Sequence, residues 1–344
     1  MSRTPTNEVS LRYLSLFSGI EAATVAWKPL GWEPVAFCEY SPFPSAVLNH
    51  HYPGIKNFGD ITQIKESDIK ALGKIDLVVF GSPCQDLSVC GNREGFNGEK
   101  SGLFRTAIKI IKWCIKHCET RFALWENVVG SFSSNEGRDF SEVLSSLCGA
   151  KLEKPQKWST SGAAYGKRGL VEWCVFDAQY FGVPQRRRRV FVFADFGEWS
   201  NRQPIFLNER NQAFLSESCD EEGNKNVSEI QESIGVLASP SKVFNTLLAS
   251  HGRTQFSANQ DLRGAYHVCY PASGKVRRLT PLECDRLMGF PDNYTQIPWF
   301  AKPLVECPDS HRIAAIGNSM AVPVMEFIGN SIQQELLRFG YIKD

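Results

Sequence analysis

The chain has 344 residues, of which 42% are hydrophobic and 22% are charged, and its formal net charge is +1. These values are ordinary for a soluble globular protein and leave room for one large domain and a smaller one. Because the net charge is close to zero, any surface for nucleic acid must be a local patch. The first ten residues are polar and no apolar run reaches transmembrane length, so we expect neither a signal peptide nor a membrane span.

Eleven cysteines are scattered along the sequence, an odd number without a regular spacing. We therefore expect reduced thiols and a cytoplasmic location. Cys114 and Cys118 lie four residues apart on an expected helix, but no second Cys/His pair follows at zinc-finger spacing. We expect no metal site, and a zinc site is the minor alternative.

The first half of the chain alternates between apolar strand-like runs and helical stretches. We expect strands at 11–17, 34–38, 75–80 and 122–125, with helices at 21–30, 42–50 and 101–118. Residues 171–178 and 189–193 follow as a hairpin-like pair of late strands. The alternation predicts an α/β fold with a doubly wound, mostly parallel sheet.

The character of the sequence changes after about residue 196. The segment 201–226 is polar and irregular, and the short segments up to residue 271 are rich in Ser, Asn, Gln, Gly and Arg. We expect a smaller, loop-rich domain at 197–307, and a large domain at 1–196 that is completed by 308–344. Helices are expected at 280–288 and at 319–339, and the second must bury its apolar face on the large domain.

The turn after the first strand carries residues 17–23, FSGIEAA. Open α/β sheets bind nucleotide ligands at such turns, although a single glycine here disfavours a pyrophosphate cradle. Glu39 ends the second strand, where an acid would bind ribose hydroxyls, and Tyr40 beside it could stack on adenine. Asp60 adds an acid near a third strand end. Each acid alone is more often a solvated surface residue, but together they suit S-adenosylmethionine, which has an adenosine and no diphosphate.

Cys84 lies in the segment 81–85, GSPCQ, directly after the buried strand expected at 75–80. A cysteine at this end of a strand would face the ligand crevice. Pro83 restricts the backbone before the thiol, and a rigid turn can aim a nucleophile at one point. Taken alone, a small buried cysteine that closes a strand is the more common explanation.

Glu126 lies in the segment 125–128, WENV, at the end of another apolar strand. A carboxyl group buried at that rim would have a raised pKa and could hold a proton near neutral pH. A Glu-Asn pair that caps a helix is the alternative.

Four consecutive arginines in the segment 185–189, QRRRR, lead into the last strand. Strand alternation places Arg187 and Arg189 on one face and Arg186 and Arg188 on the other. One pair could therefore face the crevice and bind phosphate or a base carbonyl. A solvated basic run is the alternative.

In order and spacing, these blocks resemble the DNA (cytosine-5)-methyltransferase family of bacterial and phage type. They span roughly residues 14–325, and the Pro-Cys and Glu-Asn-Val blocks with a QxRxR segment are highly specific. Between about 197 and 275 no block matches, which is where the family's target-recognition region varies. The blocks are FSGIEAA, Glu39, the GDI triplet at 59–61, GSPCQ, WENV, QRRRRV, the run 278–283 with Arg286, and 317–320 (GNSM).

The resemblance implies the Rossmann-like fold of S-adenosylmethionine methyltransferases and methylation of C5 of a flipped-out cytosine in a specific duplex DNA site. Cys84 is implied to be the nucleophile that adds to C6 of the cytosine. Glu126 is implied to contact N3 and the exocyclic amine, and Arg189, with Arg187, to lie nearest O2. The implied cofactor-binding residues are Phe17, Ser18, Gly19, Ile20, Glu39, Tyr40, Asp60, Ile61, Pro83, Asn318 and Ser319.

The segment 86–102 suits a loop that closes over the flipped base, because it has four glycines with Arg93 and Lys100. A disordered surface loop is the alternative. The expected recognition domain carries six residues of types that contact base edges, although no individual contact is predicted. They are His251, Arg253, Gln255, Asn259, Gln260 and Arg263.

We expect duplex DNA as the partner, a cognate restriction endonuclease as a functional partner without a stable complex, and a monomer. Two alternatives remain open. One is a tRNA substrate, which the sequence 84–87 and the sizeable recognition segment disfavour. The other is a catalytically silent regulator that binds DNA or the cofactor, which the presence of Cys84, Glu126 and both arginines disfavours.

Overall fold

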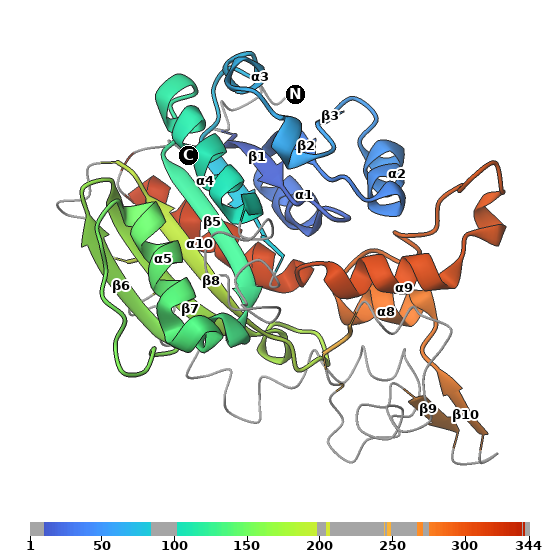
Figure 1. Ribbon diagram of the computed structural model, residues 1–344. Coiled ribbons are helices and arrows are strands. Elements are labelled where there is room, and N and C mark those ends of the chain that lie inside the picture. Colours follow the sequence, from blue (N-terminus) through green and yellow to red (C-terminus); the bar gives the residue numbers. More distant parts are fainter. Residues whose placement is uncertain are drawn as a thin grey trace, which may run out of the picture.

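The fold is seen in a computed structural model, which describes residues 10–83, 102–197, 204–206, 244, 246–248, 267–270, 275–338 and 340. An eight-stranded sheet forms its centre, and helices cover both faces of this sheet (Figure 1). The expected α/β fold with a doubly wound, mostly parallel sheet is confirmed.

The strand order in the main sheet is β3-β2-β1-β4-β5-β8-β7-β6. The first five of these strands are parallel, β8 is antiparallel to β5, and β7 and β6 continue antiparallel. The strands are β1 (Arg12–Leu16), β2 (Glu33–Cys38), β3 (Lys56–Asn57), β4 (Leu77–Phe80), β5 (Phe122–Val128), β6 (Ser161–Gly166), β7 (Gly169–Asp177) and β8 (Arg188–Asp195), and a separate ribbon pairs β9 (His267–Tyr270) with β10 (Lys275–Arg278).

The helices lie between these strands and after them. The α-helices are α1 (Ala22–Trp27), α2 (Pro42–His51), α3 (Glu66–Lys70), α4 (Gly102–His117), α5 (Arg138–Cys148), α8 (Pro281–Leu287), α9 (Asp309–Asn318) and α10 (Val322–Arg338). The short 3-10 turns are η1 (Lys28–Leu30), η2 (Ile61–Gln63), η5 (Val129–Phe132), η6 (Ser134–Gly137), η7 (Ala178–Tyr180) and η10 (Leu304–Glu306). Helix α1 stops short of the predicted residue 30 because Pro29 lies in η1.

Two hydrophobic clusters lie on opposite faces of the sheet. In β4, Leu77 and Val79 join the cluster that contains residues of α1, α2 and α10. Val78 and Phe80 join the cluster that contains residues of α4 and α5. Because both faces are buried, such a strand is apolar throughout, which is why 75–80 was recognisable as a strand.

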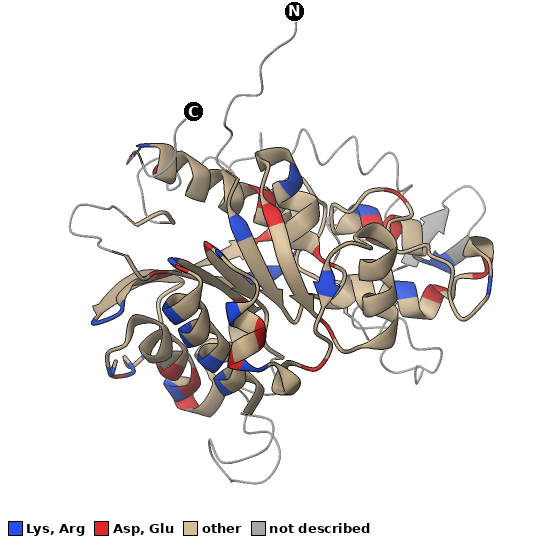
Figure 2. Cartoon of the chain, turned by 90° about the horizontal axis from the view of Figure 1, so that it is seen from above, with Lys and Arg blue, Asp and Glu red and all other residues tan. Residues whose placement is uncertain are grey.

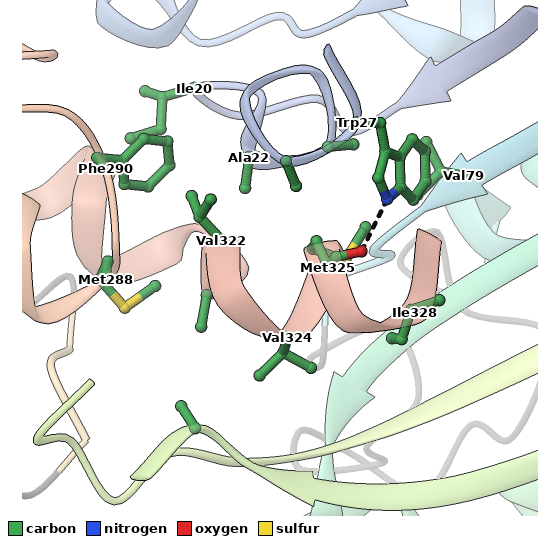
Figure 3. Close-up of a cluster of buried hydrophobic side chains, with 14 of the residues drawn as sticks. Ile20, Ala22, Trp27, Val79, Met288, Phe290, Val322, Val324, Met325 and Ile328 are labelled. Atoms are coloured by element: carbon green, nitrogen blue, oxygen red, sulfur yellow. Dashed lines mark hydrogen bonds between the residues drawn. The ribbon is translucent and has the colours of Figure 1, made fainter. Parts of the chain in front are cut away.

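The C-terminal helix α10 packs on α1 (Figure 3). The indole Nε1 of Trp27 donates a hydrogen bond of 2.8 Å to the carbonyl oxygen of Met325. Val322 and Ile328 of α10 belong to the same buried cluster. The prediction that this helix buries its apolar face on the large domain is confirmed.

The predicted helix at 319–339 is wrong at its start. Residues 309–318 form a separate helix, α9, which ends at Asn318, and α10 begins at Val322. Pro323 has no backbone N–H and its fixed φ suits the first turn of a helix, so it favours a start here over continuation from residue 319.

The elements that were not predicted include helices α3, α5 and α9 and strand β6. Helix α5 did carry a signal, because Phe140, Val143, Leu144 and Leu147 have the spacing of one buried helix face. Strand β6 consists mainly of small residues and is defined by its antiparallel ladder to β7.

Helix α8 matches the helix predicted at 280–288, and its Leu287 belongs to the same cluster as α1 and α10. Most of the segment 198–274, including His251 to Arg263, lies outside the described residues. The domain division at 197 and 307 therefore stays a prediction. Across the ranges that the structure describes, no helix combines the length and the apolar character needed to cross a membrane.

Candidate active site

The order in which the chain adds strands to the sheet reverses between β1 and β4, which makes this place the topological switch point of the sheet. The chain leaves β1 for β2 on one side and reaches β4 and β5 on the other, so the carboxyl ends of β1 and β4 border a crevice where such sheets bind ligands. A cavity of about 50 Å³ lies there. Its lining residues are Ser15, Leu16, Phe17, Ser18, Gly19, Glu21, Ala22, Ala23, Val79, Gly81, Glu126, Asn318, Ser319 and Met320.

Six residues predicted for the site therefore come together from three distant parts of the chain. Phe17, Ser18 and Gly19 follow β1, Glu126 lies in β5, and Asn318 and Ser319 lie at the end of α9. Gly81, three residues before Cys84, borders the same cavity: a Cβ at this position would lie 3.5 Å from Glu126 Oε2 and 3.2 Å from Met320 Cε. A larger residue at position 81 would narrow the cavity.

Glu39 holds the turn after β1. Its Oε2 accepts a 3.0 Å hydrogen bond from the backbone N–H of Gly19, and its Oε1 accepts one of 2.7 Å from the N–H of Ser41. Gly19 has a φ of 57°, in the left-handed region that glycine adopts without strain. Glu39 thus lies at the end of β2, as predicted, where it orders the turn at the cavity; its contact with a ribose stays a prediction.

Besides Glu39 and Pro83, four further predicted cofactor residues do not line the cavity. Asp60 accepts hydrogen bonds of 2.9 Å from the N–H and from the hydroxyl of Thr62, so it caps η2. Ile61 is buried in the cluster beneath α4, and Tyr40 is 78% exposed. Ile20 is fully buried in the cluster that holds α1. The proposed roles of these residues toward the adenosine stay predictions.

The turn that leads to Cys84 is held by side chains of β5. Asn127 Nδ2 donates a 3.0 Å hydrogen bond to the carbonyl oxygen of Ser82, and Trp125 Nε1 donates one of 3.1 Å to the Ser82 hydroxyl. Sequence analysis gave Ser82 and Asn127 no role, although both lie inside the quoted blocks. Pro83 is described and exposed, whereas Cys84 and the rest of the segment up to residue 101 lie outside the described residues.

Glu126 and Arg189 face each other on neighbouring strands. Arg189 Nε lies 3.2 Å from Glu126 Oε1, and both side chains are 13% exposed. Burial raises the pKa of Glu126, while the charges of Arg189 and Arg187 act in the opposite direction. The raised pKa confirms the prediction. The alternative of a helix cap is wrong, because β5 continues through Val128.

Arg187 binds backbone carbonyl groups from two other segments. It is buried, and its guanidinium donates to the carbonyl oxygens of Leu247, Gly317 and Ser319 at 3.0, 3.2 and 2.5 Å. Arg186 and Arg188 are exposed, so the predicted alternation is confirmed and the solvated-run alternative fails for Arg187. These hydrogen bonds hold the end of α9 and the loop after it against the residue that directly precedes β8. A contact of Arg187 with the substrate stays a prediction.

Glu21 is the cavity residue that sequence analysis missed as a site residue. It is 1% exposed, and its carboxyl group accepts hydrogen bonds from the hydroxyls of Ser15 (2.8 Å) and Thr24 (3.1 Å). Burial raises its pKa to about 7. The available signal was an ionisable side chain within the turn FSGIEAA, two residues after its only glycine.

The family model described as C-5 cytosine-specific DNA methylase matches residues 11–259 and 220–334. The chain belongs to this family. Its members are DNA-modifying enzymes, and the match extends from β1 into α10, across every element that lines the cavity. The resemblance seen in the sequence is thereby confirmed.

Relatives of the chain include methyltransferases that carry different names. It is 29% identical to a DNA N-6-adenine-methyltransferase of Escherichia phage P1, over 95% of this chain and 62% of that protein. It is 27% identical to the Type II methyltransferase M2.BsuMI of Bacillus subtilis (strain 168), over 94% of this chain and 76% of that protein. The chain thus spans less than two thirds of the phage P1 protein.

Solved structures of methyltransferases share the fold. The S. pombe Dnmt2 methyltransferase matches with a TM-score of 0.62 and 18% identity, over 94% of this chain and 99% of that chain. A putative DNA modification methyltransferase encoded within an E. coli prophage matches with a TM-score of 0.58 and 15% identity, over 95% and 99% of the two chains. At these identities the likeness establishes the fold alone.

Proposed function

We propose that this protein transfers a methyl group from S-adenosylmethionine to C5 of a flipped-out cytosine in a specific duplex DNA sequence, through a covalent bond between Cys84 and C6. One observation carries the proposal: the turn 17–23, Glu126 and the loop 318–320 line one cavity at the switch point of the sheet. The segment 81–83, which leads directly to Cys84, borders the same cavity through Gly81.

The residues around the cavity fit S-adenosylmethionine. The small residues Gly19, Ala22, Ala23 and Gly81 leave room between the strand ends, and the carboxyl groups of Glu21 and Glu126 suit a ligand with positive charge. When bound, this cofactor supplies a methyl group on a positively charged sulfur. Glu39 lies next to the turn at the end of β2, where it could reach ribose hydroxyls.

The proposed mechanism divides one difficult step into easier ones. C5 of cytosine is too weak a nucleophile to accept a methyl group unaided. The Cys84 thiolate forms a bond to C6, and the electron pair of the C5–C6 double bond makes C5 nucleophilic. After C5 is methylated, loss of its proton to a base restores the double bond and expels the thiolate.

Glu126 is suited to support the ring during this addition. Burial raises its pKa and so favours the protonated form, which can donate a hydrogen bond to N3 as this atom gains electron density during attack on C6. Arg189, 3.2 Å from Glu126 Oε1, would hold this side chain in place and present its guanidinium toward the cytosine O2. Ionisation of the Cys84 thiol would be favoured by nearby arginine charge.

The substrate must be extruded from the duplex, at a cost on the order of a few kcal/mol. We assign closure over the extruded base to 86–102 and sequence recognition to 197–307. In Figure 2, basic and acidic residues are mixed along the described chain, so binding to DNA would use a local patch. A bacterial cytoplasmic location, a monomeric state and a functional link to a restriction endonuclease complete the proposal.

Methylation of adenine N6 is a second candidate, because the phage P1 relative is named for that activity. Cytosine is favoured on chemical grounds. The N6 group is an exocyclic amine that carries its own lone pair, so its methylation needs no covalent addition to the ring. Adenine chemistry would leave Cys84 and the side chains that hold its turn without a catalytic task.

The decisive experiment uses S-adenosylmethionine with a labelled methyl group and either duplex DNA or tRNA, followed by hydrolysis and identification of the labelled nucleoside. We expect 5-methyldeoxycytidine from DNA and no product from the Cys84→Ser variant. N6-methyldeoxyadenosine or label only in tRNA would overturn the proposal, and no label at all would favour a silent regulator.

A second experiment tests the covalent step. Duplex DNA in which the target base is 5-fluorocytosine cannot lose a proton from C5, so the protein should remain attached to it under denaturing conditions. A stable adduct with the Cys84→Ser variant would contradict the assignment of the nucleophile. Bisulfite sequencing of DNA from cells that express the protein would identify the recognition sequence.

A further inference from the structure

Glu21 is a buried carboxyl group in the wall of the cavity. Among the described residues, no lysine, arginine or histidine forms an ion pair with it, and its hydrogen bonds come from neutral donors, the hydroxyls of Ser15 and Thr24 and the backbone N–H of Thr24. A carboxylate has about four acceptor sites, so Glu21 can still accept a further hydrogen bond. A carboxyl group buried without a positive partner is costly, which points to a positive charge supplied from outside the chain.

The backbone conformation of Glu21 is one that favours glycine over glutamate. Its φ of 66° and ψ of 61° lie in the left-handed region, which glycine adopts freely and glutamate rarely does. Non-glycine residues in such conformations gather at ligand-binding sites. A glutamate retained in this conformation, at the cavity wall, indicates that its side chain has a task there.

The groups that face Glu21 come from three elements besides its own. Tyr13 lies in β1, Tyr52 follows α2 and Tyr294 follows α8, and the electrostatic influence of Glu21 raises the pKa of all three hydroxyls further than burial alone does. All three are therefore neutral at physiological pH. Glu126, also in the cavity lining, adds a second acidic group, and the guanidinium of Arg189 pairs with Glu126. Among the described residues, no positively charged side chain pairs with Glu21.

We propose that Glu21 binds the α-ammonium group of the methionine part of S-adenosylmethionine. This inference rests on the proposed function, because it assumes that cofactor. Glu21 lies in the wall of this cavity together with Ser15 and Ser18, so the end of an amino-acid chain that enters the cavity would meet its carboxyl group. An ammonium group carries three N–H donors, and the remaining lone pairs of Glu21 accept from a charged donor at roughly twice the strength of a neutral one.

The inference predicts the direction in which cofactor affinity depends on pH. With a pKa of about 7, Glu21 is mostly protonated at pH 6 and mostly ionised at pH 8. Only the ionised form attracts the ammonium group, so the affinity should rise as the pH rises through 7 and then level off. Glu126 titrates in the same cavity, and a ligand without the amino group controls for its contribution.

The test compares two ligands in two proteins by isothermal titration calorimetry. The ligands are S-adenosylhomocysteine and its analogue without the α-amino group, and the proteins are the full chain and its Glu21→Gln variant. At pH 8 the full chain should prefer the amino-containing ligand by about 10- to 100-fold, the strength expected of a charge-assisted hydrogen bond. The variant should lose this preference, and the full chain should show a reduced one at pH 6.

The outcomes separate the inference from the proposed function. Equal binding of both ligands by the full chain, or an undiminished preference in the variant, would overturn the role of Glu21 while leaving the cofactor in place. Failure of both ligands to bind the full chain would overturn the cofactor itself. If Glu21→Gln does not fold, Glu21→Gly provides the same comparison, because glycine suits the backbone at this position.

Discussion

Burial shifts the pKa values of Glu21 and Glu126 more than their neighbouring charges and hydrogen bonds do. Glu126 lies 3.2 Å from a guanidinium, and its pKa is nevertheless raised. Glu21 has hydroxyl donors on both oxygens, and its pKa is raised to about 7. In both cases removal from water penalises the ionised form by more than the local contacts favour it. The protein therefore holds two protonatable carboxyl groups in one cavity.

Replacing Glu126 should slow methyl transfer in a pH-dependent way. Because the protonated form donates to N3, the rate should fall as the pH rises through the raised pKa and the proton is lost. Glu126→Ala should lower the single-turnover rate by about 10²- to 10⁴-fold. Glu126→Gln should retain more activity and lack the alkaline fall, since its amide donates at every pH.

Single-turnover rates between pH 6 and 9 measure both effects. An alkaline fall that persists unchanged in Glu126→Gln would assign it to another group and remove the proton from this role. Circular dichroism and a DNA gel-shift assay would show that the variants still fold and bind DNA.

The site residues that were predictable from the sequence are those that belong to short, specific sequence blocks. Phe17, Glu126 and Asn318 belong to short blocks whose order is specific, and the structure brings all three to one cavity. Glu21 belongs to such a block as well, but its burial depends on neighbours from β1, α2 and the segment after α8. Burial and the resulting pKa are properties of the packed molecule, so the sequence did not distinguish Glu21 from a surface acid.

The packing of α10 on α1 shows how a distant element supports the cofactor turn. Gly329 of α10 lies against Trp27 of α1, and a Cβ at Gly329 would lie 2.5 Å from two atoms of the indole ring. Helix α1 begins directly after the turn 17–21, so a displaced Trp27 would disturb the turn. The glycine is required by this close approach of the two helices.

Gly329→Ala should therefore destabilise the protein, even though alanine is the better helix former. Overpacking of this kind costs about 1–3 kcal/mol. Urea denaturation monitored by tryptophan fluorescence measures the free energy of unfolding. The control is Glu326→Ala, an exposed position in the same helix, which should change it by less than about 0.5 kcal/mol. Equal effects of the two substitutions would contradict the proposed contact.

Helices and strands were predictable where their hydrophobic residues recur at a clear period and where capping or turn residues mark their ends. Strand β4 is apolar throughout, and α8 begins with the capping box of Thr280 and Glu283. Strand β6 lacks such a signal, because its residues are small and its ladder is supplied by β7. The start of α10 was predicted at Ser319, which instead caps the end of α9, and Pro323 lies in the first turn of the helix that begins at Val322.

The free energy of unfolding of the whole molecule depends on pH, because buried acids are protonated more readily in the folded protein than in the unfolded chain. The folded protein holds the proton of Glu21 with a pKa of about 7, against an ordinary value of 4.5. Its contribution to the free energy of unfolding is complete below about pH 4.5 and is lost as the pH rises through 7. Asp285, whose burial raises its pKa to about 7, acts in the same direction.

Glu21→Gln should remove its share of this pH dependence. Between pH 5 and pH 8 the free energy of unfolding of the variant, relative to that of the unmodified chain, should rise by about 2 kcal/mol. Urea denaturation of both proteins without ligand, at several pH values, measures this difference. A difference that stays constant from pH 5 to 8 would show that Glu21 titrates normally.

The order of chemical blocks along the chain determined the fold class, the family and most of the site, because strand periodicity and reactive residue types are local properties. The segment GSPCQ was recognisable as the end of a buried strand from its neighbours in sequence. Only the tertiary structure placed Gly81 against Glu126, fastened the loop after α9 through Arg187, and buried Glu21 in the cavity wall. These features depend on contacts between segments far apart in the sequence, such as Arg187 and Ser319, which are 132 residues apart. No local pattern encodes the electrostatic environment that such contacts create.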